Sequence, residues 1–305
     1  MKIPGLVSSA LVGLFLTMAG IAAASANCPP DGWSAGDLRA LKAGGFVVAD
    51  DGHRHRLALG LLPCLADPDP SLRDGIAFEA FSTWLRAGLL DQSTRLELLK
   101  QLLPVIAPGQ SDAAGFRQPF SALVLAELAR SDRKSPYLSP AQRQALVEAA
   151  ASYLESVRDY RGYDPQDGWR HGVAHGSDLL MQLALNDALT RAQLDRILRA
   201  VRLQIAPTGE HFYIYGEPER LARPVLFIAM RGLHSPEEWT EWFDQVASPA
   251  PMSGWDQAFQ SNAGLARRHD TRAFLLVVYS ETRDSKDGQL AKLAPIVAAA
   301  LAKLP

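Results

Sequence analysis

The sequence predicts an all-α fold, an α-α superhelix of HEAT-like helix pairs. Apolar residues recur at helical spacing from residue 34 to the end of the chain, and strand-like runs are short and isolated, at residues 46–48 and 212–215. Helix pairs recur about every forty residues, the period of HEAT-like repeats. No linker rich in Ser, Gly or Pro divides residues 27–305, so we expect one helical repeat domain.

Polar capping residues mark where the predicted helices begin, because a side-chain oxygen there can accept from the first free backbone N–H groups. Ser34 stands three residues before Asp37, the spacing of a capping box, and Asp69 precedes Pro70, which suits the first helical position. Helices are predicted over residues 34–44, 57–65, 69–85, 96–108, 116–129, 139–157, 168–180, 190–205, 217–228, 235–243, 263–279 and 290–304.

One polar segment, residues 50–56, interrupts the first helices. His53 and His55 alternate about Arg54, so on a helix they would not share a face. We therefore expect an exposed loop here and no pair of metal ligands.

Composition argues against two classes of partner. The chain has 305 residues, is 48% hydrophobic and carries a formal net charge of −2, with acidic and basic residues interspersed. Binding to nucleic acid or to an anionic membrane surface normally requires a basic patch. We therefore expect no nucleic-acid partner and no electrostatic membrane attachment.

Residues 1–26 have the pattern of a secretory signal peptide. Lys2 supplies the positive charge, residues 6–23 are apolar, and Ala24, Ser25 and Ala26 form a small-residue cleavage site. We expect an exported protein, periplasmic or secreted, with no membrane contact after the signal is cleaved.

The two cysteines, Cys28 and Cys64, both lie after this cleavage site. An oxidising compartment favours a disulfide between them. Such a bond would tie the N-terminal arm to the first helices and contribute about 3 kcal/mol. The alternative is two unrelated thiols.

An ordered set of motifs resembles a bacterial family of helical proteins, domain of unknown function 2785. The resemblance covers about residues 61–243. It implies a helical fold and carries no established activity. The motifs are LLP at 61–63, DPDPSLRD at 67–74, WL at 84–85, FSALVL at 120–125, DYRGY at 159–163, GWRHGVAHGSDLL at 168–180 and GEPERLA at 216–222.

The main candidate site lies in residues 168–180. On a helix, His171 and His175 would be one turn apart on one side, with Asp178 further along the same stripe. These three are the candidate catalytic residues. Asp178 is placed to accept from His175 and fix its tautomer, while Gly172 and Gly176 would permit a close approach.

Three interpretations of this stripe stay open. The first is structural, with Asp178 bridged to Arg220 or Arg223. The second is a metal-free pocket or acid–base site. The third is a Zn²⁺ site on His171 and His175.

A zinc site would need a third ligand, and His211 and Glu217 are the candidates. A pocket rim is predicted from aromatic and arginine side chains, which are typical of recognition surfaces. The predicted binding residues are Tyr160, Arg161, Tyr163, Trp169, Glu217 and Arg220.

Two functions are consistent with these patterns. The favoured one is a scaffold that binds a protein or small molecule on the concave face of the superhelix, because no complete catalytic signature is present. The alternative is a hydrolase, with or without a metal, that uses His171 and His175.

Overall fold

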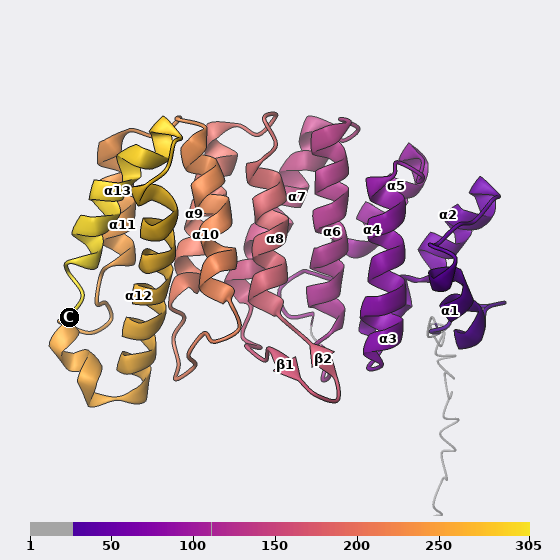
Figure 1. The fold of residues 1–305 in the computed structure, drawn as a ribbon, viewed down its shortest axis with the longest axis horizontal. Helices are drawn as coiled ribbons and strands as arrows, with labels where there is room; N and C mark the ends of the chain where they lie inside the picture. Colours follow the sequence, from indigo (N-terminus) through magenta and orange to yellow (C-terminus); the bar gives the residue numbers. More distant parts are fainter. Residues whose placement is uncertain (1–26, 111) are drawn as a thin grey trace, which may run out of the picture.

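The computed structural model describes residues 27–110 and 112–305, and the predicted signal peptide lies outside them. The all-α prediction is confirmed, because thirteen α-helices and one two-stranded hairpin make up the regular structure of this part (Figure 1). Neither residues 46–48 nor residues 212–215 form a strand. None of the described helices has the length and apolar character needed to cross a membrane.

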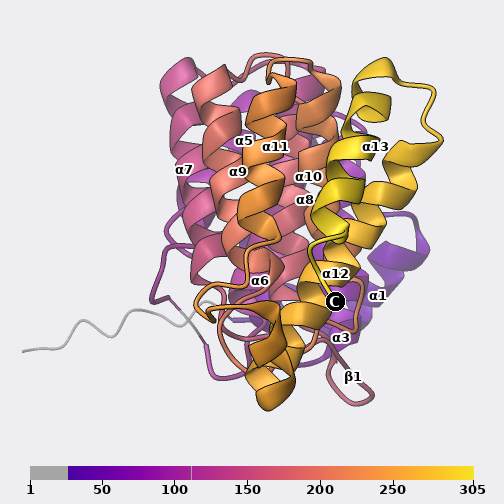
Figure 2. The same ribbon diagram turned by 90° about the vertical axis from the view of Figure 1, so that its left-hand side faces the viewer.

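The helices from α4 onward stand side by side in two layers (Figures 1 and 2). In the first layer, α8 packs between α6 and α10, and α4 and α12 extend this row at its two ends. The helices of the first layer are α4 (Glu79–Arg86), α6 (Arg117–Lys134), α8 (Gly172–Ala184), α10 (Glu217–Met230) and α12 (Asn262–Arg283).

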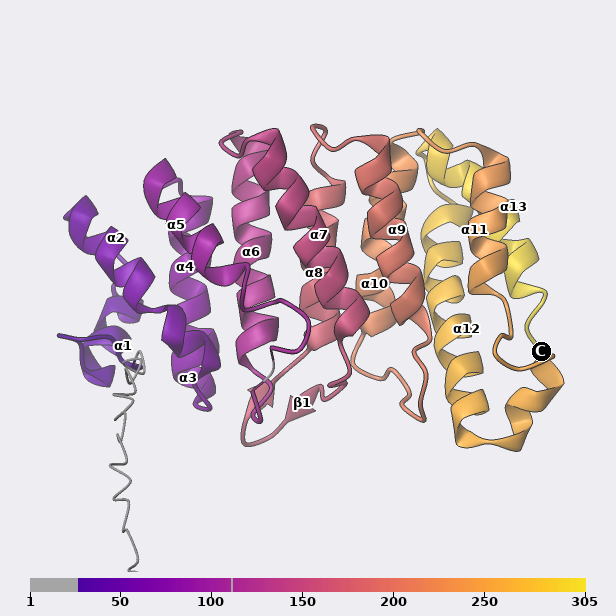
Figure 3. The ribbon, with the colours of Figure 1, turned by 180° about the vertical axis from the view of Figure 1, so that it is seen from behind.

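The second layer faces the viewer in Figure 3. Successive helices α7 and α8, and α9 and α10, pack against each other across the two layers, while α7 also packs on α9. The second layer comprises α5 (Gln92–Leu102), α7 (Pro140–Ser156), α9 (Arg191–Ile205) and α11 (Pro236–Val246), and α13 (Gly288–Leu301) packs on α11 and α12.

The predicted caps explain where several helices begin. Capping boxes form at Ser34, Ser139, Thr190 and Ser235, where each side chain accepts from a backbone N–H and the residue three positions on reaches back. Local sequence therefore determines the start of four helices.

The N-terminal part is more irregular than the layers. It contains α1 (Ala35–Ala43), α2 (Asp51–Gly60), a 3₁₀ turn (Leu62–Ala66), α3 (Pro70–Leu72) and a π-helical stretch (Arg73–Phe78) that runs into α4. A second 3₁₀ turn (Trp255–Gln260) precedes α12.

The prediction of a loop at residues 50–56 is wrong. Asp50 caps α2 by accepting from the His53 backbone N–H, so His53 and His55 are helical. The prediction missed this cap because it weighed the polarity of the segment and overlooked the capping aspartate.

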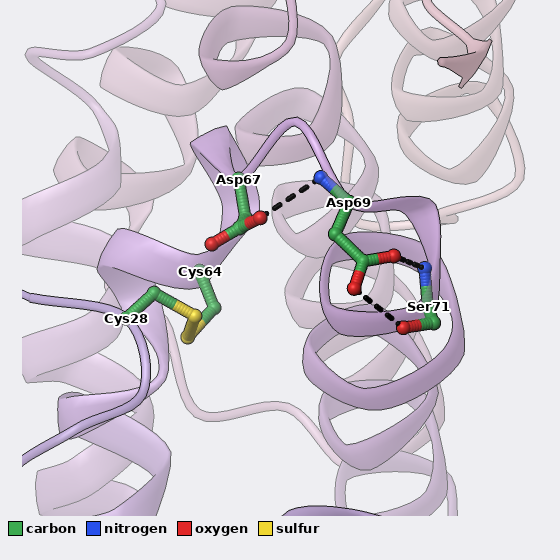
Figure 4. Close-up of a disulfide and its surroundings, with 5 residues drawn as sticks. All are labelled: Cys28, Cys64, Asp67, Asp69 and Ser71. Atoms are coloured by element: carbon green, nitrogen blue, oxygen red, sulfur yellow. Dashed lines mark hydrogen bonds between the residues drawn. A yellow bond between two sulfur atoms is a disulfide. The ribbon is translucent and has the colours of Figure 1, made fainter. Parts of the chain in front are cut away.

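Cys28 and Cys64 form a disulfide, as predicted (Figure 4). Just beyond it, the Asp69 carboxylate accepts from the backbone N–H and the hydroxyl of Ser71, both at 2.8 Å, as the predicted cap of α3 (Figure 4). The disulfide thus joins the N-terminal arm to the turn that leads into α3.

Loop lengths differ between the two edges of the layers. Residues 135–139, 185–190 and 231–235 connect helices by short turns at one edge. At the other edge, where the hairpin also lies, the connections are longer: residues 103–110 with 112–116, residues 157–171 and residues 206–216 (Figure 1). Long ordered loops on a rigid scaffold are common positions for binding sites.

Candidate functional site

The three long loops meet around a pocket of about 1130 Å³. Its walls come from Gly109, Asp112 and Gly115, from residues 156–164 and Arg170, and from residues 210–212 and 214–215, together with the adjoining ends of α6, α7 and α8. We call this cavity the loop-edge pocket. Of the predicted rim, Tyr160, Arg161 and Tyr163 line the pocket.

The other predicted binding residues lie beside the pocket and do not line it. The Trp169 ring is 5.1 Å from that of Tyr163 and 5.9 Å from that of Tyr215. Glu217 is buried and accepts from the Tyr215 backbone N–H at 2.9 Å. Trp169 and Glu217 therefore contact residues that line the pocket and do not line it themselves.

A short hairpin positions the middle loop. Strand β1 (Tyr163–Asp164) pairs antiparallel with β2 (Gly168–Trp169), and the Arg170 N–H donates to the Gly162 carbonyl at 3.0 Å. A Cβ on Gly162 would lie 2.1 Å from the Tyr215 ring. Glycine is therefore required where the hairpin loop and the loop before α10 touch.

The helix predicted from residue 168 begins four residues later. His171 has left-handed backbone angles and is the N-cap of α8, so it precedes the helix. Its ring stacks on Trp169, 4.3 Å between centroids. Hairpin pairing of Gly168 and Trp169 competes with the helix, and the sequence pattern did not reveal it.

His171 and His175 are nevertheless neighbours, with ring centroids 5.8 Å apart. Nε2 of His171 hydrogen-bonds the Tyr215 carbonyl at 3.0 Å. Nδ1 of His175 is buried with no hydrogen-bond partner in the described part of the chain, and its ring meets Phe120 edge-on. Burial lowers the pKa of His175 to about 3, so this imidazole is neutral at physiological pH.

Asp178 does not orient His175, which corrects that prediction. Its carboxylate pairs with Arg220 and lies 3.8 Å from Nη1 of Arg223. Burial raises the pKa of Asp178, and the two arginines oppose that shift. The Asp178–Arg220 ion pair is the polar bridge from α8 to α10 that the structural alternative expects.

Gly176 allows the close approach that its position predicted. A Cβ there would lie 3.0 Å from the Tyr153 ring of α7, so the neighbour is a core side chain. The tyrosine hydroxyl also donates to the Gly172 carbonyl at 3.3 Å. These glycines bring α7 and α8 together, and Gly172 and Tyr153 also line the loop-edge pocket.

The proposed zinc ligands do not converge. His211 stacks on Tyr160, 5.0 Å between centroids, while His171 faces Trp169 and Tyr215. Within residues 27–110 and 112–305, no group of three or more His, Cys, Asp or Glu side chains could hold a metal ion. The geometry therefore gives the zinc interpretation no support.

The sequence reasoning missed Asp270 as a residue that shapes the site. This residue of α12 is 1% exposed, and its carboxylate accepts from the Tyr213 backbone N–H at 2.9 Å. With Glu217, it fixes the backbone of the loop before α10. Burial raises the pKa of Asp270 to about 7. No local pattern links residues 213 and 270, so sequence alone could not identify this contact.

Two arginines were also missed. Arg170 donates to the Ala114 carbonyl at 2.7 Å, and its guanidinium lies over the Phe116 ring at 4.5 Å. Arg73 is fully buried, covers Phe116 from 3.9 Å, and donates to the Asp167 carbonyl. Both tie the hairpin loop to the α6 end of the pocket.

The fold and the site define a class of helical protein that has a loop-built pocket at one edge of a two-layered helix array. A family described as "Protein of unknown function (DUF2785)" matches residues 106–279, more than half of the chain. The chain belongs to this family. The matched region begins after the motifs at residues 61–85. It extends past residue 243, where the predicted resemblance to the family ended. No curated protein and no solved structure matched the chain.

Proposed function

We propose that this protein is an exported scaffold of HEAT-like helix pairs that binds a small molecule in the loop-edge pocket. The observation that carries the proposal is the convergence of three long loops on one cavity of about 1130 Å³. A cavity this large accommodates a small organic molecule. This places the binding site at the loop edge instead of the concave face expected from the repeat architecture.

The composition of the pocket wall supports binding. Apolar contact comes from aromatic rings such as Tyr160, Tyr163 and Phe212, and polar contact comes from arginine side chains. Ligand sites typically combine mostly apolar walls with a few fixed polar groups. Buried carboxylates at Glu217 and Asp270 hold one wall in place, so the cavity is pre-formed.

The geometry does not favour the alternative hydrolase. A general base needs a pKa near the working pH, whereas burial lowers the pKa of His175 to about 3. Asp178 is paired with Arg220, and Nδ1 of His175 has no hydrogen-bond partner among the described residues. The hydroxyl of Ser177, the serine nearest to His175 in sequence, donates to the Val173 carbonyl and not to a histidine, so it is not activated as a nucleophile.

Export is supported by two features that are independent of each other. One is the signal-peptide pattern of residues 1–26. The other is the Cys28–Cys64 disulfide, since structural disulfides persist in oxidising compartments. Cell fractionation with N-terminal sequencing tests this proposal: a protein that stays in the cytoplasm with residues 1–26 attached contradicts it.

Saturation-transfer NMR on the purified protein tests the binding function. The probes are phenol, benzyl alcohol, benzylamine and benzoate, chosen to cover neutral, cationic and anionic aromatic molecules. We expect at least one probe to bind and Tyr163→Ala to weaken that binding, because Tyr163 lines the pocket and is 50% exposed.

Leu203→Ala is the matched control. Leu203 is 54% exposed on α9 and does not line the pocket, so the change should leave binding unaltered. Binding that is equally strong in the Tyr163→Ala protein, or absent for all probes, rejects the loop-edge pocket as the site.

A further inference from the structure

We propose that the loop-edge pocket selects small organic anions, in which a carboxylate or phosphate group is joined to an aromatic or other apolar body. This inference rests on the proposed binding function and specifies its ligand class. It follows from which charged groups around the pocket already have partners and which do not.

Three of the four lining carboxylates are occupied within the protein. Asp112 accepts from the backbone N–H groups of residues 115–117 at the start of α6. Asp159 pairs with Arg161, whose Nε lies 2.8 Å from Oδ1. Asp164 accepts from two backbone N–H groups of the hairpin turn. These carboxylates have little capacity left to bind a cationic ligand.

The fourth lining carboxylate, Glu210, is exposed. Water and salt screen a charge in this position far more than one inside the cavity. Arg158, which also lines the pocket, is exposed as well and is screened in the same way, so the preference for an anion rests on the three occupied carboxylates and on direct contact with this guanidinium.

Among the arginines that line the pocket, one lacks a carboxylate partner within the described residues. Arg158 lines the pocket and has no carboxylate partner among the described residues. Its Nη1 donates to the carbonyls of Glu155 and Val157, at 2.8 and 2.7 Å, which fixes the guanidinium at the end of α7. A positioned guanidinium without a counter-ion is suited to bind a carboxylate or a phosphate.

A neutral imidazole lies on the adjacent wall. His211 lines the pocket, and its Nε2 is buried without a hydrogen-bond partner in the described residues. Burial lowers the pKa of His211, so the ring is neutral at physiological pH and one of its nitrogens carries a proton. A ligand oxygen could satisfy this nitrogen.

Apolar surface adjoins these polar groups. The His211 ring stacks on Tyr160, and Phe212 and Ile214 belong to the same wall. An anion with an apolar body would bury that body against these side chains while its charged group meets Arg158. A simple inorganic anion would leave the apolar wall uncovered.

Isothermal titration calorimetry on the full protein at pH 7.5 tests the inference. The probes are benzoate, phenyl phosphate, neutral benzyl alcohol and cationic benzylamine. We expect at least one anion to bind ten times more tightly than benzyl alcohol, with an affinity that falls as salt is added. The ratio of benzoate to phenyl phosphate affinity distinguishes carboxylate from phosphate recognition.

Arg158→Gln should lower the affinity for the preferred anion about tenfold, and Arg158→Lys should restore part of it. Arg199→Gln is the matched control, because Arg199 is exposed on α9 away from the pocket. It should leave the affinity unchanged. If Arg158→Gln does not fold, the ratio of anion to neutral affinity in the unchanged protein and its salt dependence decide the question.

Two outcomes overturn the inference in different ways. Equal or tighter binding of benzyl alcohol or benzylamine rejects anion selection and retains the proposed binding function. Failure of all four probes to bind rejects both.

Discussion

At the scale of single residues, burial decides the chemistry of the polar side chains around α8. His175 is 8% exposed and neutral, and Asp178 is 9% exposed but faces two arginines of α10. Both residues belong to the stripe that the sequence singled out. Their surroundings make one a buried, neutral imidazole and the other a bridge between helices.

Asp178→Asn should destabilise the protein by about 1 to 2 kcal/mol, because it removes the carboxylate that joins α8 to Arg220. The loss stays below that of a fully buried pair, since a third of the Arg220 side chain is exposed and can be rehydrated. Urea unfolding measures it.

Glu219→Gln is the control, because Glu219 is exposed on the same helix as Arg220. It should change the free energy of unfolding by less than about 0.5 kcal/mol. An Asp178→Asn protein as stable as this control would contradict the bridge.

Asp270 should make stability depend on pH. Folded Asp270 keeps its proton up to about pH 7, whereas an unfolded aspartate loses it near pH 4. Unfolding therefore releases a proton between these values, so this residue's contribution to the free energy of unfolding falls as pH rises from about 4 to about 7.

Asp270→Asn removes this titration and keeps an oxygen that can accept from Tyr213. The stability of the unchanged protein relative to the variant should fall by about 1.4 kcal/mol per pH unit across that interval. Urea unfolding at pH 5, 6 and 7 measures the difference. Parallel pH profiles for the two proteins would refute the assignment.

At the scale of elements, the loops position the pocket and the helices support them. The β1–β2 hairpin delays the start of α8 to Gly172 and turns His171 toward Tyr215. Helix starts with a capping box followed the sequence closely, as at Ser139 and Thr190. The start of α8 was not predicted correctly, because Gly168 and Trp169 pair as a strand and His171, in a left-handed conformation, takes the N-cap position without a side-chain cap.

Gly162→Ala should disturb this junction. The added Cβ would overlap the Tyr215 ring, which must move away from the hairpin. We expect a loss of about 1 to 3 kcal/mol, typical of overpacking, together with weaker binding of any pocket ligand. Thermal unfolding and saturation-transfer NMR measure the two effects.

Gly288→Ala serves as the control for this substitution. Space around Gly288 is open, and the residue begins α13, far from the pocket in sequence. The control should keep the melting temperature and ligand binding. A Gly162→Ala protein that behaves in the same way would show that the contact with Tyr215 does not shape the pocket.

At the scale of the whole molecule, packing runs mainly between neighbouring helices, as from α6 to α8 to α10. Helices α1 and α2 lie at one end of this array and α13 at the other (Figure 1). The Cys28–Cys64 disulfide joins the N-terminal arm to the 3₁₀ turn that follows α2. In such arrays, stability is approximately a sum of local contributions.

Removing the disulfide with Cys28→Ala/Cys64→Ala should cost about 3 to 4 kcal/mol, since the two cysteines are 36 residues apart. Hydrogen exchange should speed up in α1 to α4 and stay unchanged in α12 and α13. A uniform loss of protection along the chain would show that the array unfolds as one unit and would contradict the repeat description.

Much of the fold could be predicted from sequence because its signals are local. Capping residues and apolar spacing act within a few positions, so most helices lie where they were predicted. The segment at residues 50–56 is an exception in which the cap itself was overlooked. For the site, the sequence identified Tyr160, Arg161 and Tyr163, which line the pocket, because aromatic and arginine side chains cluster there.

From the sequence alone the helical class and the family could be predicted, and a disulfide was favoured for its two cysteines. The partners of Asp178, the neutral state of His175 and the gathering of three loops around one pocket follow from the folded structure. These depend on contacts between residues far apart in the chain, such as Asp178 with Arg220, 42 positions away, and Tyr213 with Asp270, 57 positions away. Periodicity and capping carry no information over such separations, so packing alone places these side chains together.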